Sequence, residues 1–339
     1  MTARAARLAA DPRAAGLILL ALAVAPLTLW AMTAGSAALS PAAVIGALAA
    51  PDGSREAVIV THVRLPRVLA ALVAGSGLAT AGAVMQAVTA NPLASPSLLG
   101  VNAGAAFAVV LAMVLAPGGG GTGHVLAAFA GAGMATVAVY ALGSAGRGGA
   151  TPLRLALAGA VISAFLAALT AAVLIFDQRT LAAVRLWTVG SLEGRQMAAV
   201  LSVLPWWAAG LAGTLACRGQ VMTLSLGAAV AQGVGQNLPL WRGLSALAVV
   251  LMAGAAVALT GPVGFVGLVV PHVARLVAGA DYRWILPYSA VMGALLVLLA
   301  DGGLRHLLPG RDIPVGVAMA LIGAPFFIWL ARTRIGAVR

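Results

Sequence analysis

Lysine is absent from the 339-residue sequence, so all 20 of its Lys and Arg positions are arginine. A Walker A loop needs a lysine that reaches the nucleotide phosphates, and any ATP that this chain uses must therefore be hydrolysed on another chain. Cys217 is the single cysteine, which excludes an intrachain disulfide and a multi-cysteine metal site. Charged residues make up only 8% of the chain, whereas a soluble domain has about 25%.

Apolar residues dominate instead, at 62% of the chain with a mean hydropathy of +1.05. This composition excludes a water-soluble enzyme, and long apolar runs without alternation predict membrane-spanning helices of about 20 residues. We expect an all-α polytopic membrane protein in which residues 1–339 form one transmembrane domain with about ten spans. The expected spans are Ala15–Thr33, Val68–Ala90, Leu98–Leu115, Val125–Leu142, Leu155–Phe176, Met197–Cys217, Gly243–Leu259, Phe265–Ala278, Ile285–Ala300 and Val315–Leu330.

Arginine positions predict the orientation, because cytoplasmic loops carry an excess of basic residues. With residues 1–14 as a cytoplasmic tail, 12 of the 20 arginines fall inside and eight outside, so we expect both termini in the cytoplasm. The first apolar run lacks a small-x-small cleavage site and is expected to be a span, not a cleaved signal peptide. The outer arginines are Arg55, Arg64, Arg67, Arg179, Arg185, Arg195, Arg305 and Arg311.

The expected spans contain no Asp, Glu or Arg away from their ends. Ion-coupled transporters usually keep such a residue, or a histidine relay, inside the membrane, so this pattern argues against proton- or sodium-driven transport. Ser76 has no acid or base nearby in the sequence, and no other catalytic constellation stands out. We expect His272 to cap or pack a helix end. The three histidines expected to be solvated near the outer face are His62, His124 and His306.

Small residues spaced four apart, such as Gly75/Ala79 and Gly131/Ala135, predict close packing between helices. Longer motifs follow one another along the chain. They are Arg64-Leu-Pro-Arg67, Gly82-Ala-Val-Met-Gln86, Asn91-Pro-Leu-Ala94, Leu98-Leu-Gly-Val-Asn102, Leu157-Ala-Gly159, Trp187-Thr-Val-Gly-Ser191, Leu224-Ser-Leu-Gly227, Gly261-Pro-Val-Gly-Phe-Val-Gly-Leu268, Pro271-His-Val-Ala-Arg275, Asp281-Tyr-Arg283, Ile313-Pro-Val-Gly316 and Ile322-Gly-Ala-Pro325. In this order they resemble the FecCD family of ABC importer permeases, which carry iron-siderophore complexes, haem or cobalamin.

The resemblance implies a type II ABC importer permease fold and a transport subunit that is not itself an enzyme. It implies a bacterial inner-membrane complex of two permeases, either two copies or two related chains, with two cytoplasmic ATPases and one external binding protein. The substrate path would lie between the permeases. ATP and Mg²⁺ would bind the ATPases, no cofactor or metal would bind this chain, and nucleic acid is not an expected partner.

The resemblance also suggests roles for residues at the outer face. Arg64, Arg67 and Arg305 match positions that meet acidic residues of the binding protein. Guanidinium groups suit this role because they form bidentate pairs with carboxylates and stay charged. The alternative is that these side chains extend to lipid head groups.

At the inner face, Asn91 and Leu93 match part of the cytoplasmic gate, although Asn91-Pro92 is also an ordinary helix stop. The second half of that gate is less well matched, because this chain has Thr151-Pro152-Leu153 where related permeases often carry small hydroxyl residues. A coupling segment over about 222–240 matches the part of the family that seats in the ATPase. Its assigned residues are Leu226, Gly227, Ala231 and Gly235, flanked by Arg218 and Arg242. We expect Gly227 to begin a short helix and Gly235 to cap its end. Ala228 and Ala229 stand where many relatives have acidic residues.

The substrate is inferred from local similarity. Residues 186–195 resemble siderophore permeases, and Arg195-Gln196-Met197 lacks the aromatic side chain that haem and cobalamin permeases tend to carry shortly after the glycine-rich turn, so a ferric siderophore is favoured. Haem and cobalamin remain alternatives. An ion-coupled secondary transporter, which needs no ATPase, and a non-transporting membrane scaffold are the alternatives from other classes.

Overall fold

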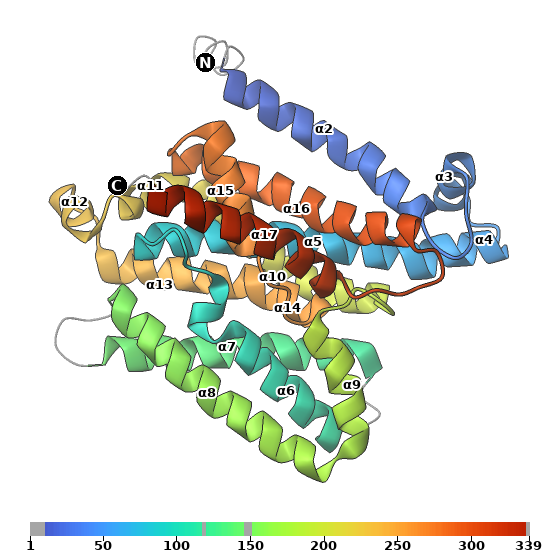
Figure 1. Cartoon of the computed structure of the whole chain (residues 1–339), viewed down its shortest axis with the longest axis horizontal. Coiled ribbons are helices and arrows are strands. Elements are labelled where there is room, and N and C mark those ends of the chain that lie inside the picture. Colours follow the sequence, from blue (N-terminus) through green and yellow to red (C-terminus); the bar gives the residue numbers. More distant parts are fainter. Residues whose placement is uncertain (1–10, 117–119, 146–150, 337–339) are drawn as a thin grey trace.

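The computed structural model describes residues 11–116, 120–145 and 151–336, and every regular element within these ranges is helical. Most of the long helices run side by side along the long axis of the molecule (Figure 1). One end of this bundle carries α3 (Pro41–Ala49), α4 (Arg55–Val58) and α9 (Gln178–Val189). The opposite end carries α11 (Arg218–Ser225) and α12 (Ala228–Gly233), and there α2 begins and α17 ends.

Within the described residues, seven helices are long and apolar enough to cross a membrane, and three shorter apolar helices accompany them. Each of the ten expected spans corresponds to one of these helices, so the all-α polytopic fold is confirmed. The long helices are α2 (Pro12–Thr33), η1 with α5 (Ile59–Arg64, Leu65–Thr89), α7 (Gly120–Ser144), α8 (Pro152–Phe176), α10 (Met197–Ala216), α13 with η3 and α14 (Leu238–Val249, Val250–Gly254, Ala255–Thr260) and α16 (Tyr282–Leu307). The shorter ones are α6 (Val101–Leu115), α15 (Val266–Ala278) and α17 (Val315–Gly336).

Local capping explains where several helices begin. Ser40, Thr151 and Asn237 each accept a hydrogen bond from a backbone N–H in the first turn of α3, α8 and α13. A proline follows each cap within the first two helical positions, where its missing N–H costs nothing. The sequence therefore sets the start of these helices locally, independently of the membrane.

Helix α5 forms the centre of the bundle and packs against α16, α15, α14 and α10. In the helix containing α5, 89% of the most apolar 18-residue stretch is buried inside the molecule. In α8 the corresponding share is only 6%. A Cβ added to Gly75 of α5 would lie 2.1 Å from the carbonyl oxygen of Gly293, so the α5 and α16 backbones touch. Gly131 likewise faces Gly104, which confirms the predicted small-residue packing.

The structure corrects the expected helix ends. The second span starts at Arg55 through α4 and the π-helical segment η1, thirteen residues before the expected Val68. Helix α16 continues to Leu307, so Asp301 lies inside a helix and is not at its end as expected. Asp301 is 2% exposed, and a carboxylate at such a site needs compensating charge. The expectation that charge lies only at span ends is therefore wrong at Asp301.

Candidate functional site

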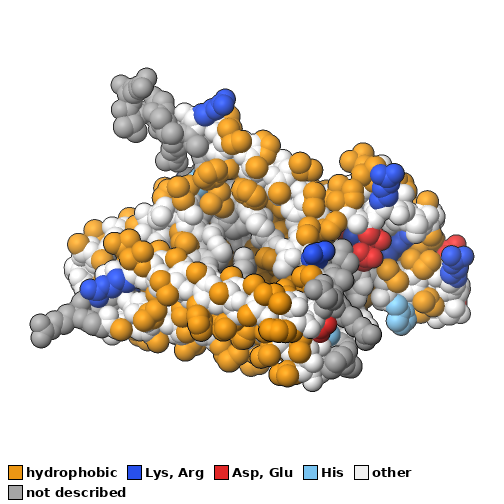
Figure 2. Space-filling view, turned by 60° about the horizontal axis from the view of Figure 1, so that its bottom comes forward, with side chains coloured by type: hydrophobic (Ala, Val, Ile, Leu, Met, Phe, Trp, Pro, Cys, Tyr) orange, Lys and Arg blue, Asp and Glu red, His pale blue; other side chains and the backbone are white. Residues whose placement is uncertain are grey.

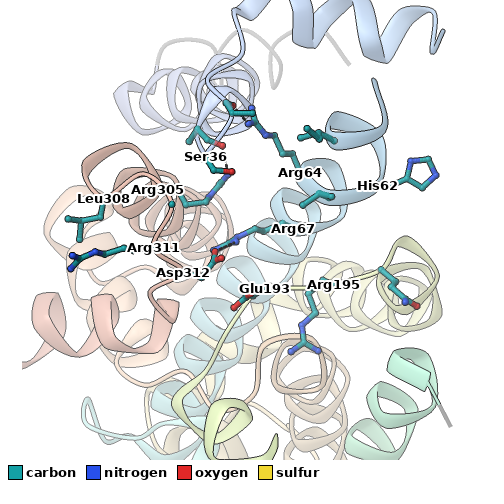
Figure 3. A pocket seen from close by; sticks show the side chains of 18 residues that line it. Ser36, His62, Arg64, Arg67, Glu193, Arg195, Arg305, Leu308, Arg311 and Asp312 are labelled. Atoms are coloured by element: carbon teal, nitrogen blue, oxygen red, sulfur yellow. Dashed lines mark hydrogen bonds and ion pairs between the residues drawn. The ribbon is translucent and has the colours of Figure 1, made fainter. Parts of the chain in front are cut away.

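A cavity of about 560 Å³ lies at the end of the bundle that carries α3, α4 and α9. Its walls come from the segment after α2, from η1 with the start of α5, from the α9–α10 connection and from the end of α16. Figure 3 shows the polar side chains of these segments gathered around it. The charged residues that line it are Arg64, Arg67, Arg195, Arg305, Arg311, Glu193 and Asp312, an excess of positive charge.

Asp301 lies behind the cavity wall and binds two of the arginines that line it. It accepts hydrogen bonds from Arg67 at 2.9 and 3.1 Å and from Arg305 Nε at 3.0 Å. Arg67 Nη1 also donates to Asp312 Oδ1 at 3.0 Å. Two guanidinium groups thus share one buried carboxylate, and this ion network joins α5 to α16 across 234 residues of sequence.

Arg64 is bound differently from the other two arginines. Its guanidinium donates to the carbonyl oxygens of Met32, at 2.6 Å, and Ala37, just after α2. No described carboxylate lies within ion-pair distance of Arg64. Peptide carbonyls are therefore the groups that stabilise its charge among the described residues.

The structure brings Arg64, Arg67 and Arg305 together, although they come from distant parts of the sequence. They are only 4%, 8% and 7% exposed in the isolated chain, so they are not freely projecting side chains. A binding-protein carboxylate would have to reach into the cavity and compete with Asp301 for two of them. The docking role of these arginines stays a prediction, and sequence reasoning missed Asp301 and Asp312 as their partners.

The surface is apolar along the middle of the molecule and carries charged side chains at one end. Figure 2 shows hydrophobic side chains covering most of one face, with arginine, acidic and histidine side chains gathered at the end opposite α12. Such a middle band suits contact with lipid hydrocarbon or with another apolar surface. Both ends are therefore accessible for other molecules when the chain lies in a membrane.

The segment expected to couple to an ATPase forms the short helix α12 between two glycines. Gly227 precedes it at φ 96° and Gly235 follows it at φ 81°, both in the region that favours glycine. The Gln236 N–H donates to the carbonyl of Ala231 and the Gly235 N–H to that of Gln232, each at 2.9 Å. This pair of bonds is a Schellman motif, so the predicted glycine cap is confirmed.

One side of this segment packs inward and the other faces outward. Ala231 is fully buried against Leu224 and Leu238. Three apolar side chains at this end, Leu226, Val230 and Val234, are 47–69% exposed. Of the flanking arginines, Arg218 is exposed and Arg242 half-buried. The segment thus presents an unpartnered apolar patch at the end of the molecule, while its coupling role stays a prediction.

The expected gate residues lie just past α5. Asn91 Oδ1 accepts a hydrogen bond from the Leu93 N–H at 2.9 Å, which is the Asx turn of a helix stop. Leu93 is 51% exposed. A cavity of about 140 Å³ next to them is lined by the last residues of α5, Pro152 of α8, Gly227 and Arg242. The end of α5, the start of α8 and the coupling segment therefore share one cavity, but the gate role is untested.

The histidines divide into exposed and buried ones. His62 and His306 are exposed near the outer cavity as expected, and His306 stacks on Trp30 with ring centroids 4.4 Å apart. His272 is buried within α15, so it packs there and does not cap an end. His124 departs from expectation: its Nε2 is buried, so the prediction of a solvated side chain is wrong.

The fold and its two polar ends define a multi-pass helical membrane protein. The chain belongs to the FecCD transport family, whose sequence profile matches residues 19–333. It is 44% identical over 281 residues to the Bacillus subtilis (strain 168) protein named probable siderophore transport system permease protein YfiZ, covering 83% of this chain and 84% of that protein. It is 40% identical over 325 residues to the ferric enterobactin transport system permease protein FepD of Escherichia coli (strain K12), covering 95% of this chain and 96% of that protein. The vitamin B12 import system permease BtuC of Yersinia enterocolitica is 40% identical over 293 residues, covering 83% of each chain.

Among solved structures, the chain is similar to one described as a metal-chelate type ABC transporter in an inward-facing conformation. The TM-score is 0.81 at 27% sequence identity, and the match covers 94% of this chain and 98% of the other. The likeness therefore extends over the whole bundle and both of its ends.

Proposed function

We propose that this chain is the membrane-spanning permease subunit of an ATP-binding-cassette importer that moves a ferric siderophore into a bacterial cytoplasm. The observation that carries the proposal is the FecCD match over residues 19–333, together with relatives whose names specify siderophore transport. The chain itself has no lysine for a nucleotide-binding loop, so ATP and Mg²⁺ belong to a separate ATPase. It acts as a transport subunit and carries out no chemistry on its substrate.

The proposal includes a second permease, either another copy or a related chain, with the substrate path between the two. Helix α8 supports this, since its apolar surface is almost entirely unburied in the isolated chain. A large iron chelate cannot pass through one bundle of touching helices, whereas an interface between two bundles can open. Two ATPases and one external binding protein complete the complex, and lipid surrounds it.

We place the arginine-lined cavity outside and α12 inside, with both termini cytoplasmic. The excess of arginine on the α12 side of the expected topology supports this orientation. Docking of the binding protein at the outer cavity, gating by Asn91 and Leu93, and coupling through α12 are parts of the same proposal. Ala228 and Ala229 cannot supply salt bridges to the ATPase, so any polar contacts of the coupling segment come from the flanking Arg218 and Arg242.

Arg64 gives the most direct test of docking. Arg64→Gln should weaken binding of the purified binding protein a few-fold and reduce its salt dependence, since single ion pairs contribute about 0.2–1 kcal/mol. The matched control is Arg55→Gln, an exposed arginine in α4 at the same end. If Arg64→Gln and the wild type bound the binding protein with equal affinity and equal salt dependence, Arg64 would not be part of the docking surface.

The substrate is tested by uptake in cells that lack the chain. Restoring it should restore accumulation of iron from a radiolabelled ferric siderophore, but not of labelled haem or cobalamin. The relative named for vitamin B12 import makes cobalamin the second candidate, because its identity to this chain equals that of the enterobactin permease. Uptake of cobalamin without uptake of any ferric siderophore would replace the proposed substrate.

A further inference from the structure

A second cavity, of about 440 Å³, lies beside the outer arginine-lined one and extends into the chain itself. Glu193, Gly194, Arg195 and Asp312 line both cavities. Its rim includes the exposed Glu193 and Gly194, whereas its floor includes Trp187 and Ala258, which are 7% and 1% exposed. This volume falls within the range of about 300–1,000 Å³ typical of small-molecule sites. We name it the Arg195 cavity.

Two polar atoms at the Arg195 cavity are buried without a hydrogen-bond partner among the described residues. They are Nε of Arg195 and Nε2 of His124. The Arg195 Nη2 atom reaches only the carbonyl of Ser191, at 3.5 Å, the long limit of a hydrogen bond. Buried polar groups in native proteins are nearly always paired, so two unpaired ones around one cavity indicate a missing partner.

The α9–α10 connection and the start of α7 bring these two groups to the same cavity. Arg195 lies in the connection between α9 and α10, and the neighbouring Gln196 lies within 4 Å of a Cβ position built on Gly121, one turn before His124. Figure 3 shows the Arg195 guanidinium pointing away from Arg64, Arg67 and Arg305, so it does not belong to the Asp301 network. Burial lowers the pKa of Arg195 because no described carboxylate compensates its charge.

The charges of the lining restrict the ligand to a single negative charge. Arg195 is an uncompensated cation, which favours an anion. Glu193 and Asp312 stand on the same cavity, and Asp312 is already paired to Arg67 at 3.0 Å. A dianion such as phosphate would be repelled by these carboxylates, whereas a monocarboxylate matches the one free guanidinium edge.

Most of the remaining lining is apolar. Met113, Val125, Ala258 and Pro314 line the cavity together with the Trp187 ring. These apolar groups do not stabilise a fully hydrated inorganic anion. They can stabilise an organic anion by burying its apolar or aromatic part. The cavity therefore combines one charged anchor with an apolar floor.

We propose that the Arg195 cavity binds a small organic monocarboxylate, with its carboxylate on Arg195 and His124 and its apolar body against Trp187. The residues that line this site all belong to one chain. It does not rest on the proposed transport function, because it concerns binding to the isolated chain.

The test uses the purified full-length chain in detergent, with para-fluorobenzoate as the probe and fluorine NMR as the readout. We expect saturable binding of one probe per chain and no saturable binding of the uncharged isostere para-fluorobenzamide. Arg195→Gln should weaken binding of the probe by about tenfold or more, because a charge-assisted hydrogen bond is lost. His124→Ala should weaken it to a smaller extent. The matched control, Arg185→Gln on exposed α9, should leave affinity within about twofold.

The comparison of para-fluorobenzoate with para-fluorobenzamide uses the wild-type chain. It therefore tests the proposal even if a substituted chain does not fold. Equal binding of the two probes would overturn the proposal, as would unchanged affinity in a folded Arg195→Gln variant. Displacement of the probe by inorganic phosphate at lower concentration than by acetate would also overturn it, because the site would then select a phosphate.

Discussion

Asp301 determines the charge balance of the outer cavity at the scale of single residues. It is 2% exposed and sits between Arg67 and Arg305, which compete for its two oxygens. Without it, two buried guanidinium groups would face each other with only the half-exposed Asp312 to offset them. Asp301 therefore acts as the structural counter-ion of the arginines assigned to docking.

Asp301→Asn should strongly destabilise the chain for this reason. Removing one partner from a buried ion network costs about 3–5 kcal/mol, because the remaining charges stay buried without compensation. The thermal unfolding midpoint of the detergent-purified protein measures the effect. Asp312→Asn is the matched control, since its side chain is 51% exposed and its pair with Arg67 is worth about 1 kcal/mol or less. Equal midpoints for the two variants would show that Asp301 is not the structural counter-ion.

Close backbone contacts between helices matter at the scale of elements. The α5–α16 pair is held by Gly75 and Gly293, which face each other. Gly75→Ala should lower the unfolding midpoint, since the new methyl group would overlap the Gly293 carbonyl and overpacking costs about 1–3 kcal/mol.

The control for that helix contact is Gly213→Ala in α10, where nothing lies within 4 Å of the added Cβ. There the change should be neutral or stabilising by about 1 kcal/mol at most, because alanine favours a helix over glycine. If Gly75→Ala were as stable as Gly213→Ala, the α5–α16 contact would not be the tight junction described.

The start of α12 supplies a prediction for coupling. Gly227 has φ 96° and ψ 161°, a conformation essentially restricted to glycine, so Gly227→Ala costs about 1–3 kcal/mol and displaces the helix. With the partner ATPase bound, this variant should still hydrolyse ATP but transport less per ATP. Gly219→Ala in α11, with open space around its Cβ, is the control and should couple normally. If Gly227→Ala transported a normal amount of substrate per ATP, α12 would not be the segment that couples the chain to the ATPase.

The spans could be predicted from sequence because each is a long apolar run. The glycines at the two ends of α12 could be predicted because they lie only a few residues apart in the sequence. The end of α16 could not be predicted, since a helix is expected to stop before Asp301 unless its charge is neutralised. That neutralisation comes from Arg67, 234 residues away. Helix α9 is too polar to resemble a span, and the burial of His124 depends on the cavity formed by α6, α7, α14 and the α9–α10 connection.

At the scale of the whole molecule, both ends of the described chain lie on the α12 side of the bundle (Figure 1). The proposed orientation therefore makes one parity prediction. A reporter that is active only in the cytoplasm should be active when it is fused after Arg339. The same reporter fused to the N-terminus should also be active. Reporters on opposite sides of the membrane would contradict an even number of spans.

ATP-dependent uptake into proteoliposomes tests the central claim most directly. Vesicles would contain this chain with its permease partner and ATPases, and the binding protein would present a radiolabelled ferric siderophore outside. We predict accumulation that requires internal ATP, disappears when the Walker A lysine of the ATPase is replaced, and persists when a protonophore collapses the ion gradients. Uptake that continues with the inactive ATPase and stops with the protonophore would contradict the account and identify an ion-coupled transporter.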